Sequence, residues 1–285
     1  MSTLIHANDI SKHYKHTQAL DHVSFDINKG QIIGLLGRNG AGKTTLLKIL
    51  LGLSSYQGEL SVLGMQPRQD RTALMQRMCF IADVAILPKW LKVKDALNFL
   101  EGVHPKFNRE KALMFIERTN VPLRGKVRHL SKGMATQLHL ALVMAIDVEI
   151  LVLDEPTLGL DILYRKTFYQ NLLNDYFNEA RTIIIATHQI EEIEGLLTDV
   201  MMLDQGHLLL KQSTTELSEH FVALTVRSDQ ADEVRKLKPL SEQVQIGQVK
   251  FIFEQADRQQ LSAWGVLSNP SVSEIFVAKI SGGGR

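Results

Sequence analysis

Residues 37–45 have the types and the spacing of a loop that binds phosphate. In order they read G-R-N-G-A-G-K-T-T, which fits the pattern G-x-x-x-x-G-K-[ST]. Its glycines let the backbone turn tightly and approach an anion without a Cβ in the way. The Lys43 ammonium would reach the β- and γ-phosphates, and the Thr44 hydroxyl would face Mg²⁺. The segment therefore predicts a site for a nucleoside triphosphate and Mg²⁺.

The sequence on both sides of this loop predicts the elements that must hold it. Residues 31–36 (QIIGLL) are a short apolar run, and residues 44–51 (TTLLKILL) carry a helical pattern that Gly52 ends. A helix that begins at Lys43 would point the positive end of its dipole at the phosphates. The alternative is a chance glycine-rich turn, but the strand–loop–helix order is the one that the motif requires.

Two acidic residues follow a second apolar run, residues 150–153 (ILVL), which ends in Asp154-Glu155-Pro156. Because ligands bind at the carboxyl ends of strands in an open parallel sheet, we expect both acids beside the phosphate loop. We assign Asp154 to the metal and Glu155 to the attacking water, the two tasks that phosphoryl transfer to water requires. A plain strand-ending turn is the alternative, since Asp and Pro are common in turns.

A third apolar run, residues 182–187 (TIIIAT), ends at His188. At the same edge of the same sheet, this imidazole could hydrogen-bond the γ-phosphate or the attacking water and hold Glu155 in place. A histidine after a strand can equally be structural, and its position in the sequence does not separate the two interpretations.

The order of the predicted elements indicates an α/β fold. Fully apolar strands that alternate with helices are typical of a parallel sheet covered on both faces. A helix-rich stretch at about residues 86–146 forms a subdomain within the predicted first domain, residues 1–216. The pattern then changes to alternating strands, with a hairpin turn at Gly247-Gln248. We expect a small α+β domain at 217–285 that ends in a flexible tail, SGGGR.

Composition excludes several classes of protein. A formal net charge of +1 over 285 residues argues against a dedicated nucleic-acid binder. The single cysteine, Cys79, allows no internal disulfide and lies in an apolar run, which favours a core thiol over a catalytic one. We see neither a signal peptide nor an apolar run of about 18 residues, the length of a spanning helix. Any membrane role would therefore come through a partner.

Five motifs in order give the chain a resemblance to the nucleotide-binding subunit of ABC transporters, over about residues 4–210. Residues 37–45 resemble the Walker A loop of the family, and residues 130–134 (LSKGM) resemble its signature. Residues 150–156 resemble the Walker B strand, residues 158–161 (LGLD) the D-loop, and His188 the switch histidine. The resemblance implies a P-loop NTPase (RecA-like) core with an N-terminal antiparallel β subdomain and a helical signature subdomain. The small C-terminal α+β appendage resembles those of export-type systems.

The resemblance also implies a mechanism. Two subunits would sandwich two ATP molecules head to tail, each site pairing one chain's Walker A loop with the other chain's signature. Ser131 would cap a helix and clasp the γ-phosphate across the dimer, although an ordinary N-cap also fits it. A homodimer is favoured over a heterodimer because Ser131, Gly133 and Glu155 are all kept. Closure and opening would drive a transmembrane permease, with the chain at the cytoplasmic face of a bacterial inner membrane.

Several positions leave alternatives open. Tyr14 matches the aromatic that stacks on adenine, but a plain surface or core tyrosine also fits. Asp83 stands where the family has a glutamine, and its shorter, charged side chain would hold metal or water with a different reach. Lys132 replaces a glycine of the signature, and we favour solvent over phosphate for it. Trp90 would be a docking patch if exposed and core if buried.

The predicted site is therefore as follows. The ATP-binding residues are Tyr14, Gly37, Asn39, Gly40, Ala41, Gly42, Lys43, Thr44, Thr45, Ser131, Gly133 and Asp161; the metal ligands are Thr44, Asp154 and Asp83; the catalytic residues are Glu155 and His188. An ATPase that acts on nucleic acid is disfavoured, because such proteins carry two cassettes or a long coiled coil. A regulatory, sensing or surface-assembly ATPase without transport remains the alternative.

Overall fold

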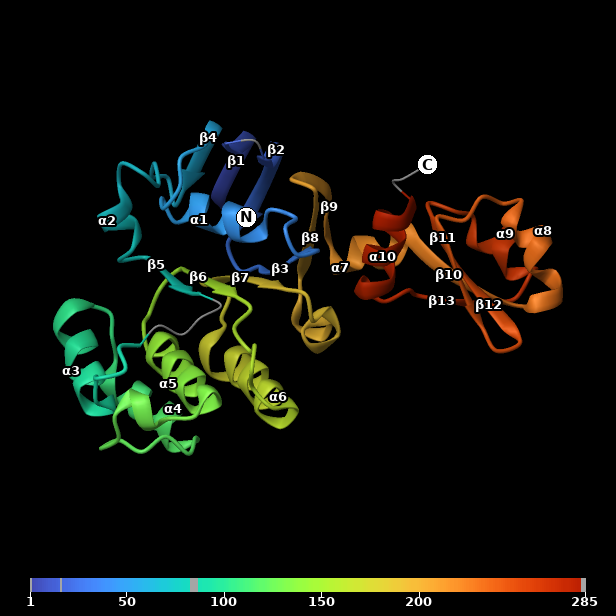
Figure 1. Cartoon of the computed structure of the whole chain (residues 1–285). Helices are drawn as coiled ribbons and strands as arrows, with labels where there is room; N and C mark the ends of the chain where they lie inside the picture. Colours follow the sequence, from blue (N-terminus) through green and yellow to red (C-terminus); the bar gives the residue numbers. More distant parts are fainter. Residues whose placement is uncertain (1, 16, 83–86, 283–285) are drawn as a thin grey trace.

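The structure, a computed structural model, describes residues 2–15, 17–82 and 87–282, which form three sheets (Figure 1). The central sheet has six strands in the order β5-β6-β7-β3-β8-β9. Their bounds are β3 (Ile32–Gly37), β5 (Met78–Ile81), β6 (Ile150–Asp154), β7 (Thr182–Thr187), β8 (Asp199–Asp204) and β9 (His207–Ser213). The strands from β5 to β8 in this order run parallel to one another, and β9 pairs with β8 in the antiparallel sense.

Side chains of the central strands alternate between two buried clusters. On β3, Ile32 and Leu36 face the cluster that contains α5 and α6, whereas Ile33 and Leu35 face the cluster that contains α1. All residues of β3, β6 and β7 are buried. A strand covered on both faces must be apolar on both, which explains the continuous apolar runs in the sequence.

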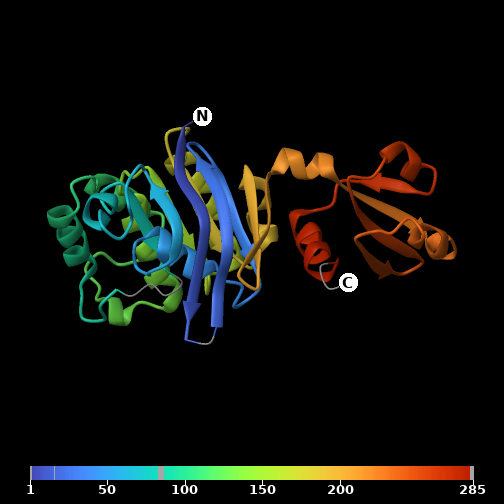
Figure 2. The same ribbon diagram turned by 90° about the horizontal axis from the view of Figure 1, so that it is seen from above.

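An antiparallel sheet and one helix cover the first face of the central sheet. The sheet has the order β2 (Thr17–Asn28), β1 (Thr3–Tyr14) and β4 (Gln57–Val62), and α1 (Lys43–Leu50) lies between it and the central strands (Figures 1 and 2). The short helix α2 (Arg71–Leu74) leads from this layer to β5. On β5, Cys79 packs against the main core, and burial raises the pKa of its thiol to about 11. The neutral thiol suits a core residue.

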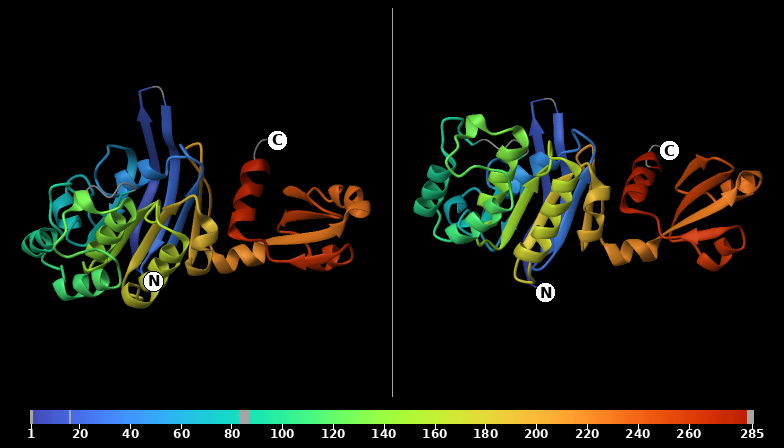
Figure 3. Two further views of the ribbon diagram at one scale, coloured as in Figure 1. Left: turned by 60° about the horizontal axis from the view of Figure 1, so that its bottom comes forward. Right: turned by 90° about the horizontal axis from the view of Figure 1, so that it is seen from below.

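Helices cover the opposite face, which Figure 3 turns towards the viewer. They are α3 (Val93–Val103), α4 (Arg109–Glu117), the 3₁₀ turn η1 (Val127–His129), α5 (Lys132–Met144), α6 (Ile162–Asn171) and the π turn η2 (Leu172–Tyr176). The first four make up the predicted helical subdomain, although its predicted start at residue 86 lies outside the described residues. Two 3₁₀ turns, η3 (Ile190–Glu192) and η4 (Glu194–Leu196), connect β7 to β8.

The C-terminal part has a sheet of its own, joined to the rest through α7 (Thr214–His220). The strand order is β11 (Ser241–Gln245), β12 (Gln248–Glu254), β10 (Phe221–Arg227) and β13 (Val266–Ser268). One face is covered by η5 (Ser228–Gln230), α8 (Ala231–Arg235) and α9 (Arg258–Ser262), and the other by α10 (Val272–Gly282). The predicted α/β core with its antiparallel, helical and C-terminal parts is confirmed.

Two details of the C-terminal prediction were wrong. The hairpin loop is Ile246-Gly247, because Gln248 already pairs with Gln245 in the ladder. Helix α10 extends to Gly282, so the first two residues of the predicted tail are helical, and residues 283–285 lie outside the described residues. The helix continues this far because Ile275 and Ala278 bury one of its faces, a constraint that the glycine-rich ending does not reveal.

Candidate nucleotide-binding site

The predicted phosphate loop connects the end of β3 to the start of α1. Gly40 and Gly42 have positive φ (83° and 107°), which other residues adopt only with strain. A Cβ on Gly42 would lie 2.5 Å from the carbonyl oxygen of Ala19, and one on Gly37 would lie 2.6 Å from that of Leu203. Glycine is thus required at 37 and 42 by close neighbours, and at 40 by conformation alone, since nothing lies within 4 Å of a Cβ there.

The first turn of α1 is open to an anion. Its N-cap is Gly42, which has no side chain to accept hydrogen bonds from the turn. The amides of Lys43, Thr44 and Thr45 therefore have no acceptor within the helix, and the positive end of the dipole lies with them. Such a helix start is a phosphate-binding geometry. Ala41 is buried beneath the loop, whereas Asn39 and Gly40 are exposed on it.

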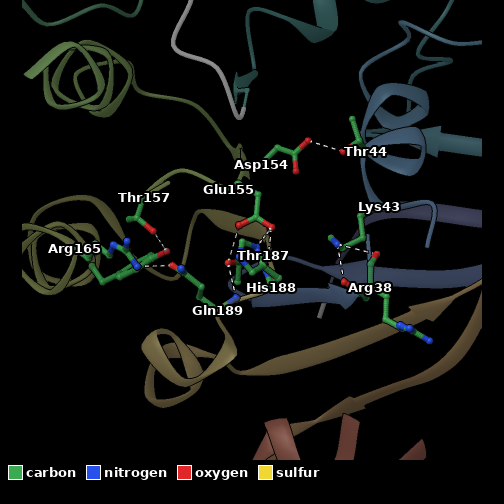
Figure 4. A network of polar contacts seen from close by, with 12 residues as sticks. Arg38, Lys43, Thr44, Asp154, Glu155, Thr157, Arg165, Thr187, His188 and Gln189 are labelled. Carbon is green, nitrogen blue, oxygen red and sulfur yellow. Dashed lines mark hydrogen bonds and ion pairs between the residues drawn. The ribbon is translucent and has the colours of Figure 1, made fainter. Parts of the chain in front are cut away.

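Lys43 is buried within the loop, at 8% exposure. Its Nζ donates to the carbonyl oxygens of Gly37 (2.7 Å) and Arg38 (3.3 Å), as Figure 4 shows. Burial lowers the pKa of Lys43, and the nearby carboxylates of Glu155 and Asp154 oppose that change. The ammonium is thus held where phosphate oxygens could replace its present carbonyl partners.

Thr44 and Asp154 meet across the space between α1 and β6. The Thr44 hydroxyl donates to Asp154 Oδ2 (2.9 Å). A hydroxyl and a carboxylate are the hard oxygen ligands that Mg²⁺ prefers, and Mg²⁺ usually takes only one or two from protein beside phosphates and water. Among the described residues no cluster of three or more His, Cys, Asp or Glu could hold a metal by itself, so the pair fits Mg²⁺ bound together with a nucleotide. Asp83, the third predicted ligand, lies outside the described residues.

Glu155 lies at the carboxyl end of β6 and reaches across to β7. Its carboxylate accepts hydrogen bonds from Thr187 Oγ1 (3.0 Å) and from the amide of His188 (3.0 Å). The backbone has a positive φ of 48°, held by a bond from Glu155 N to Ala186 O (2.8 Å). A left-handed conformation is unusual for glutamate and is often found at functional sites.

His188 completes this group through Nδ1, which lies 2.8 Å from Glu155 Oε1. An ionised carboxylate can only accept, so Nδ1 carries the hydrogen in this pair and Nε2 remains for a ligand. The ring is about half exposed. The contact is the one expected if His188 holds Glu155 in place, while its catalytic role stays a prediction.

Arg165 is a residue of this region that the sequence reasoning missed. Its Nη1 donates to Gln189 Oε1 (2.7 Å) and Glu192 Oε1 (2.8 Å), and its Nε donates to the carbonyl oxygen of Leu160 (2.8 Å). One guanidinium thus joins the predicted D-loop to the segment after His188 (Figure 4). Its partners at 189 and 192 are distant in the sequence, and no local pattern pairs them with Arg165.

The predicted signature and D-loop adjoin each other at the starts of two helices. Ser131 is the N-cap of α5 and accepts from Met134 N (3.2 Å), and Asp161 is the N-cap of α6 and accepts from Tyr164 N (2.9 Å). A Cβ on Gly159 would lie 3.1 Å from Lys132 Cε, so the exposed Lys132 rests its stem on the D-loop. A Cβ on Gly133 would lie 3.9 Å from the carbonyl oxygen of Gly159, so Gly133 also faces the D-loop. Within the described residues, Ser131 makes no hydrogen bond to the phosphate loop of its own chain.

Two aromatic residues can now be assigned to the surface. Tyr14 is 44% exposed, and its hydroxyl forms a hydrogen bond with Ser54 (3.2 Å). This hydrogen bond lowers the pKa of Tyr14, and a hydrogen bond with Thr45 lowers it by a smaller amount. Tyr14 therefore lies near the first turn of α1, and Lys12 Nζ lies over one face of its ring, 4.8 Å from the centroid. Trp90 is 74% exposed, which excludes the core interpretation, whereas Leu91 packs against the main core.

Fold and site define a P-loop NTPase, and comparison with known proteins narrows the class. The profile of the ABC transporter family matches residues 20–158. The bacitracin transport ATP-binding protein BcrA of Bacillus licheniformis is 32% identical over 73% of this chain and 69% of its own. The Nod factor export ATP-binding protein I of Cupriavidus pinatubonensis is 28% identical over 92% of this chain and 84% of its own. The chain belongs to the ABC transporter ATP-binding family and is an ABC-class ATPase.

Solved structures agree with this assignment at the level of the fold. An ATP-binding subunit of an ABC transporter superposes with a TM-score of 0.67 at 23% identity, covering 76% of this chain and 92% of that one. A dimeric ATP-binding cassette in a post-hydrolysis state with ADP and Pi gives 0.63 at 19% identity, over 73% and 98% of the two chains. Within the described ranges, no helix combines the length and apolar character needed to cross a membrane.

Proposed function

We propose that this chain hydrolyses ATP as one half of a head-to-tail homodimer and drives a separate transmembrane permease, in the direction of export. The observation that carries the proposal is the grouping of Lys43, Asp154 and Glu155 at one edge of the central sheet. The chemistry follows from these positions. Lys43 and the open amides of α1 bind the β- and γ-phosphates, and Glu155 aligns or deprotonates the attacking water.

Other residues of the site orient these groups. Thr187 and His188 fix the carboxylate of Glu155, and His188 Nε2 is available to the γ-phosphate or the water. Thr44 and Asp154 would hold Mg²⁺, whose charge stabilises the phosphates when it is bound. Tyr14, which is 44% exposed, stacks on the base with the ring face that Lys12 does not cover. The role of Asp83 stays a prediction.

A second copy of the chain is part of the proposal because the start of α5, capped by the neutral Ser131, suits an anion but makes no hydrogen bond to its own phosphate loop within the described residues. Asp161 lies at the start of α6, where its carboxylate suits a partner chain rather than a phosphate. Directly after Asp161, Ile162 and Leu163 are 78% and 80% exposed. Adjacent large apolar side chains at such exposure are typical of an interaction surface. We therefore place the homodimer contact over these residues.

Replacing Ile162 with aspartate is expected to weaken ATP-dependent dimerisation by about a hundredfold or more, because burial of such a side chain contributes about 1.5–3 kcal/mol and a homodimer loses two. Folding should be unaffected, since aspartate is favoured in the first turn of a helix. The measurement is analytical ultracentrifugation with ATP in a Glu155→Gln background. Val244→Asp, at an equally apolar site 70% exposed on β11, is the matched control. Equal dimerisation of both variants would contradict the proposed contact.

A permease partner is supported by relatives that are named as transport ATP-binding proteins, and export by the Nod factor export relative among them. The Nod factor export relative matches 92% of this chain, which includes C-terminal residues beyond the ATP-binding part. Trp90, with its ring exposed in the helical subdomain, is a suitable docking residue for the permease. We propose that the chain is held at the cytoplasmic face of a bacterial inner membrane through this partner.

The proposed division into domains, at residues 216 and 217, falls within α7.

Affinity capture of tagged Glu155→Gln from detergent-solubilised membranes, with and without ATP, tests the partner. We expect a polytopic membrane protein to be recovered together with the chain. Adding Trp90→Ala should lower that recovery by about tenfold, because exposed tryptophans often dominate interface energetics. ATP binding, measured in the same preparation, should be retained. Recovery of soluble partners alone, with the chain absent from membranes, would favour the regulatory or sensing ATPase instead.

A further inference from the structure

The segment that begins at His188, residues 188–197, has little regular structure of its own; we call it the switch segment. Its two turns, η3 and η4, are single 3₁₀ turns, with bonds such as Ile193 N to Ile190 O (3.0 Å) and Leu196 N to Ile193 O (2.8 Å). Bonds of this kind have poorer geometry than those of an α-helix. The position of the switch segment therefore depends on the groups that pack against it.

Helix α10 of the C-terminal part packs against the switch segment. Val272 and Ile275 of α10 lie in the same buried cluster as Ile190 and Ile193, and α10 contacts η3 directly. Ile193 and Ile275 are 0% and 1% exposed. An apolar contact this well buried joins two parts of the chain that are about 80 residues apart.

Two glutamates of the switch segment bind the first turn of α10. Val272 N donates to Glu194 Oε1 (2.8 Å), and Ser273 Oγ donates to Glu191 Oε1 (2.6 Å). Both carboxylates lie at the positive end of the dipole of this 11-residue helix. The hydrogen bond from Ser273 lowers the pKa of Glu191. Charge-assisted bonds hold their partners in a narrower geometry than neutral ones.

The opposite flank of α10 is anchored to the C-terminal sheet. Glu274 pairs with Lys250 of β12, and Lys279 Nζ lies 2.7 Å from Glu254 Oε1. Ile252 of β12 belongs to the same buried cluster as α10. Figures 1 and 2 show α10 between the C-terminal sheet and the ATP-binding part. A movement of the sheet would therefore be transmitted to α10.

Arg165 holds the switch segment from the other side, through Gln189 and Glu192. We infer that α10 is the second support, and that the C-terminal part sets the rate of ATP hydrolysis by positioning His188 through Glu191, Glu194 and Ser273. These are positioning residues, since they act through His188. The inference rests on the proposed function, because it takes His188 to be a catalytic residue.

The test compares full-length variants by steady-state kinetics. Glu191→Gln/Ser273→Ala should lower kcat by about three- to tenfold, because small displacements of catalytic groups are costly. KM for ATP should stay unchanged, since α10 makes none of the phosphate-loop contacts described above. Ser273→Thr keeps the hydroxyl and should retain wild-type kcat. Glu233→Gln on α8 removes a comparable bond, from Lys236 at the C-cap of that helix (2.6 Å), and should change nothing.

His188→Ala, assayed in parallel, separates the two ideas. If it abolishes hydrolysis while the double variant keeps wild-type kcat, α10 does not position His188 and the proposed function stands. If His188→Ala itself retains wild-type turnover, the proposed role of His188 is wrong and the inference falls with it. A raised kcat, or a raised KM alone, in the double variant also overturns the inference. So does a Ser273→Thr variant whose kcat falls as far as that of the double variant, because packing would then explain the loss.

Discussion

Glu155→Gln is expected to lower the rate of ATP hydrolysis by about 10²–10⁴-fold while leaving ATP binding intact, because the amide cannot accept a proton from the attacking water. The amide oxygen can still accept from the amide and Nδ1 of His188, so the local geometry should be preserved. Phosphate release measures the rate, and calorimetry with ATP measures binding. A stable ATP-bound dimer should accumulate, since the step that opens it is blocked.

Glu149→Gln is the matched control for this variant. Glu149 precedes the opposite end of β6 and pairs with Arg77 (2.6 Å), far along the strand from the phosphate loop. The same chemical change there should lower stability slightly and leave kcat at the wild-type value. Turnover of Glu155→Gln at the wild-type rate would remove Glu155 from the mechanism.

Lys43→Ala is expected to weaken ATP binding by about 10- to 150-fold, since a hydrogen bond to a charged group contributes about 1.5–3 kcal/mol. The lost ammonium is buried among the carbonyl oxygens of the loop, so no neighbouring cation can replace it without reshaping residues 37–42. Titration calorimetry with ATP measures the affinity, and a thermal melt checks that the fold survives.

Lys48→Ala gives the matched control in the same helix. Lys48 lies in the last turn of α1, is exposed, and carries the same charge as Lys43. Its replacement should change the ATP affinity by little, because surface charges at this distance are screened. Equal affinities of Lys43→Ala and the wild type would count against the phosphate-loop interpretation of residues 37–45.

Local features of the site could be predicted because their physics is local. The positive φ of Gly40 and Gly42 is a local requirement of the phosphate loop that favours glycine, and α1 begins where its pattern predicts, at Lys43. Likewise, the fully apolar runs of β6 and β7 indicated buried parallel strands, whose carboxyl ends must meet at one edge. This is why Asp154, Glu155 and His188 could be placed together from their order alone.

Contacts between distant segments were decided only by the tertiary structure. Arg165 reaches Gln189 and Glu192 because α6 packs beside β7, and Ser273 reaches Glu191 across 82 residues because α10 folds back from the C-terminal sheet. Side chains of these types are common on any surface, and no spacing marks them as partners. The sequence by itself thus determined the nucleotide site and the layers that carry it. The supports of the switch segment depend on packing between elements, which periodicity and local motifs do not encode.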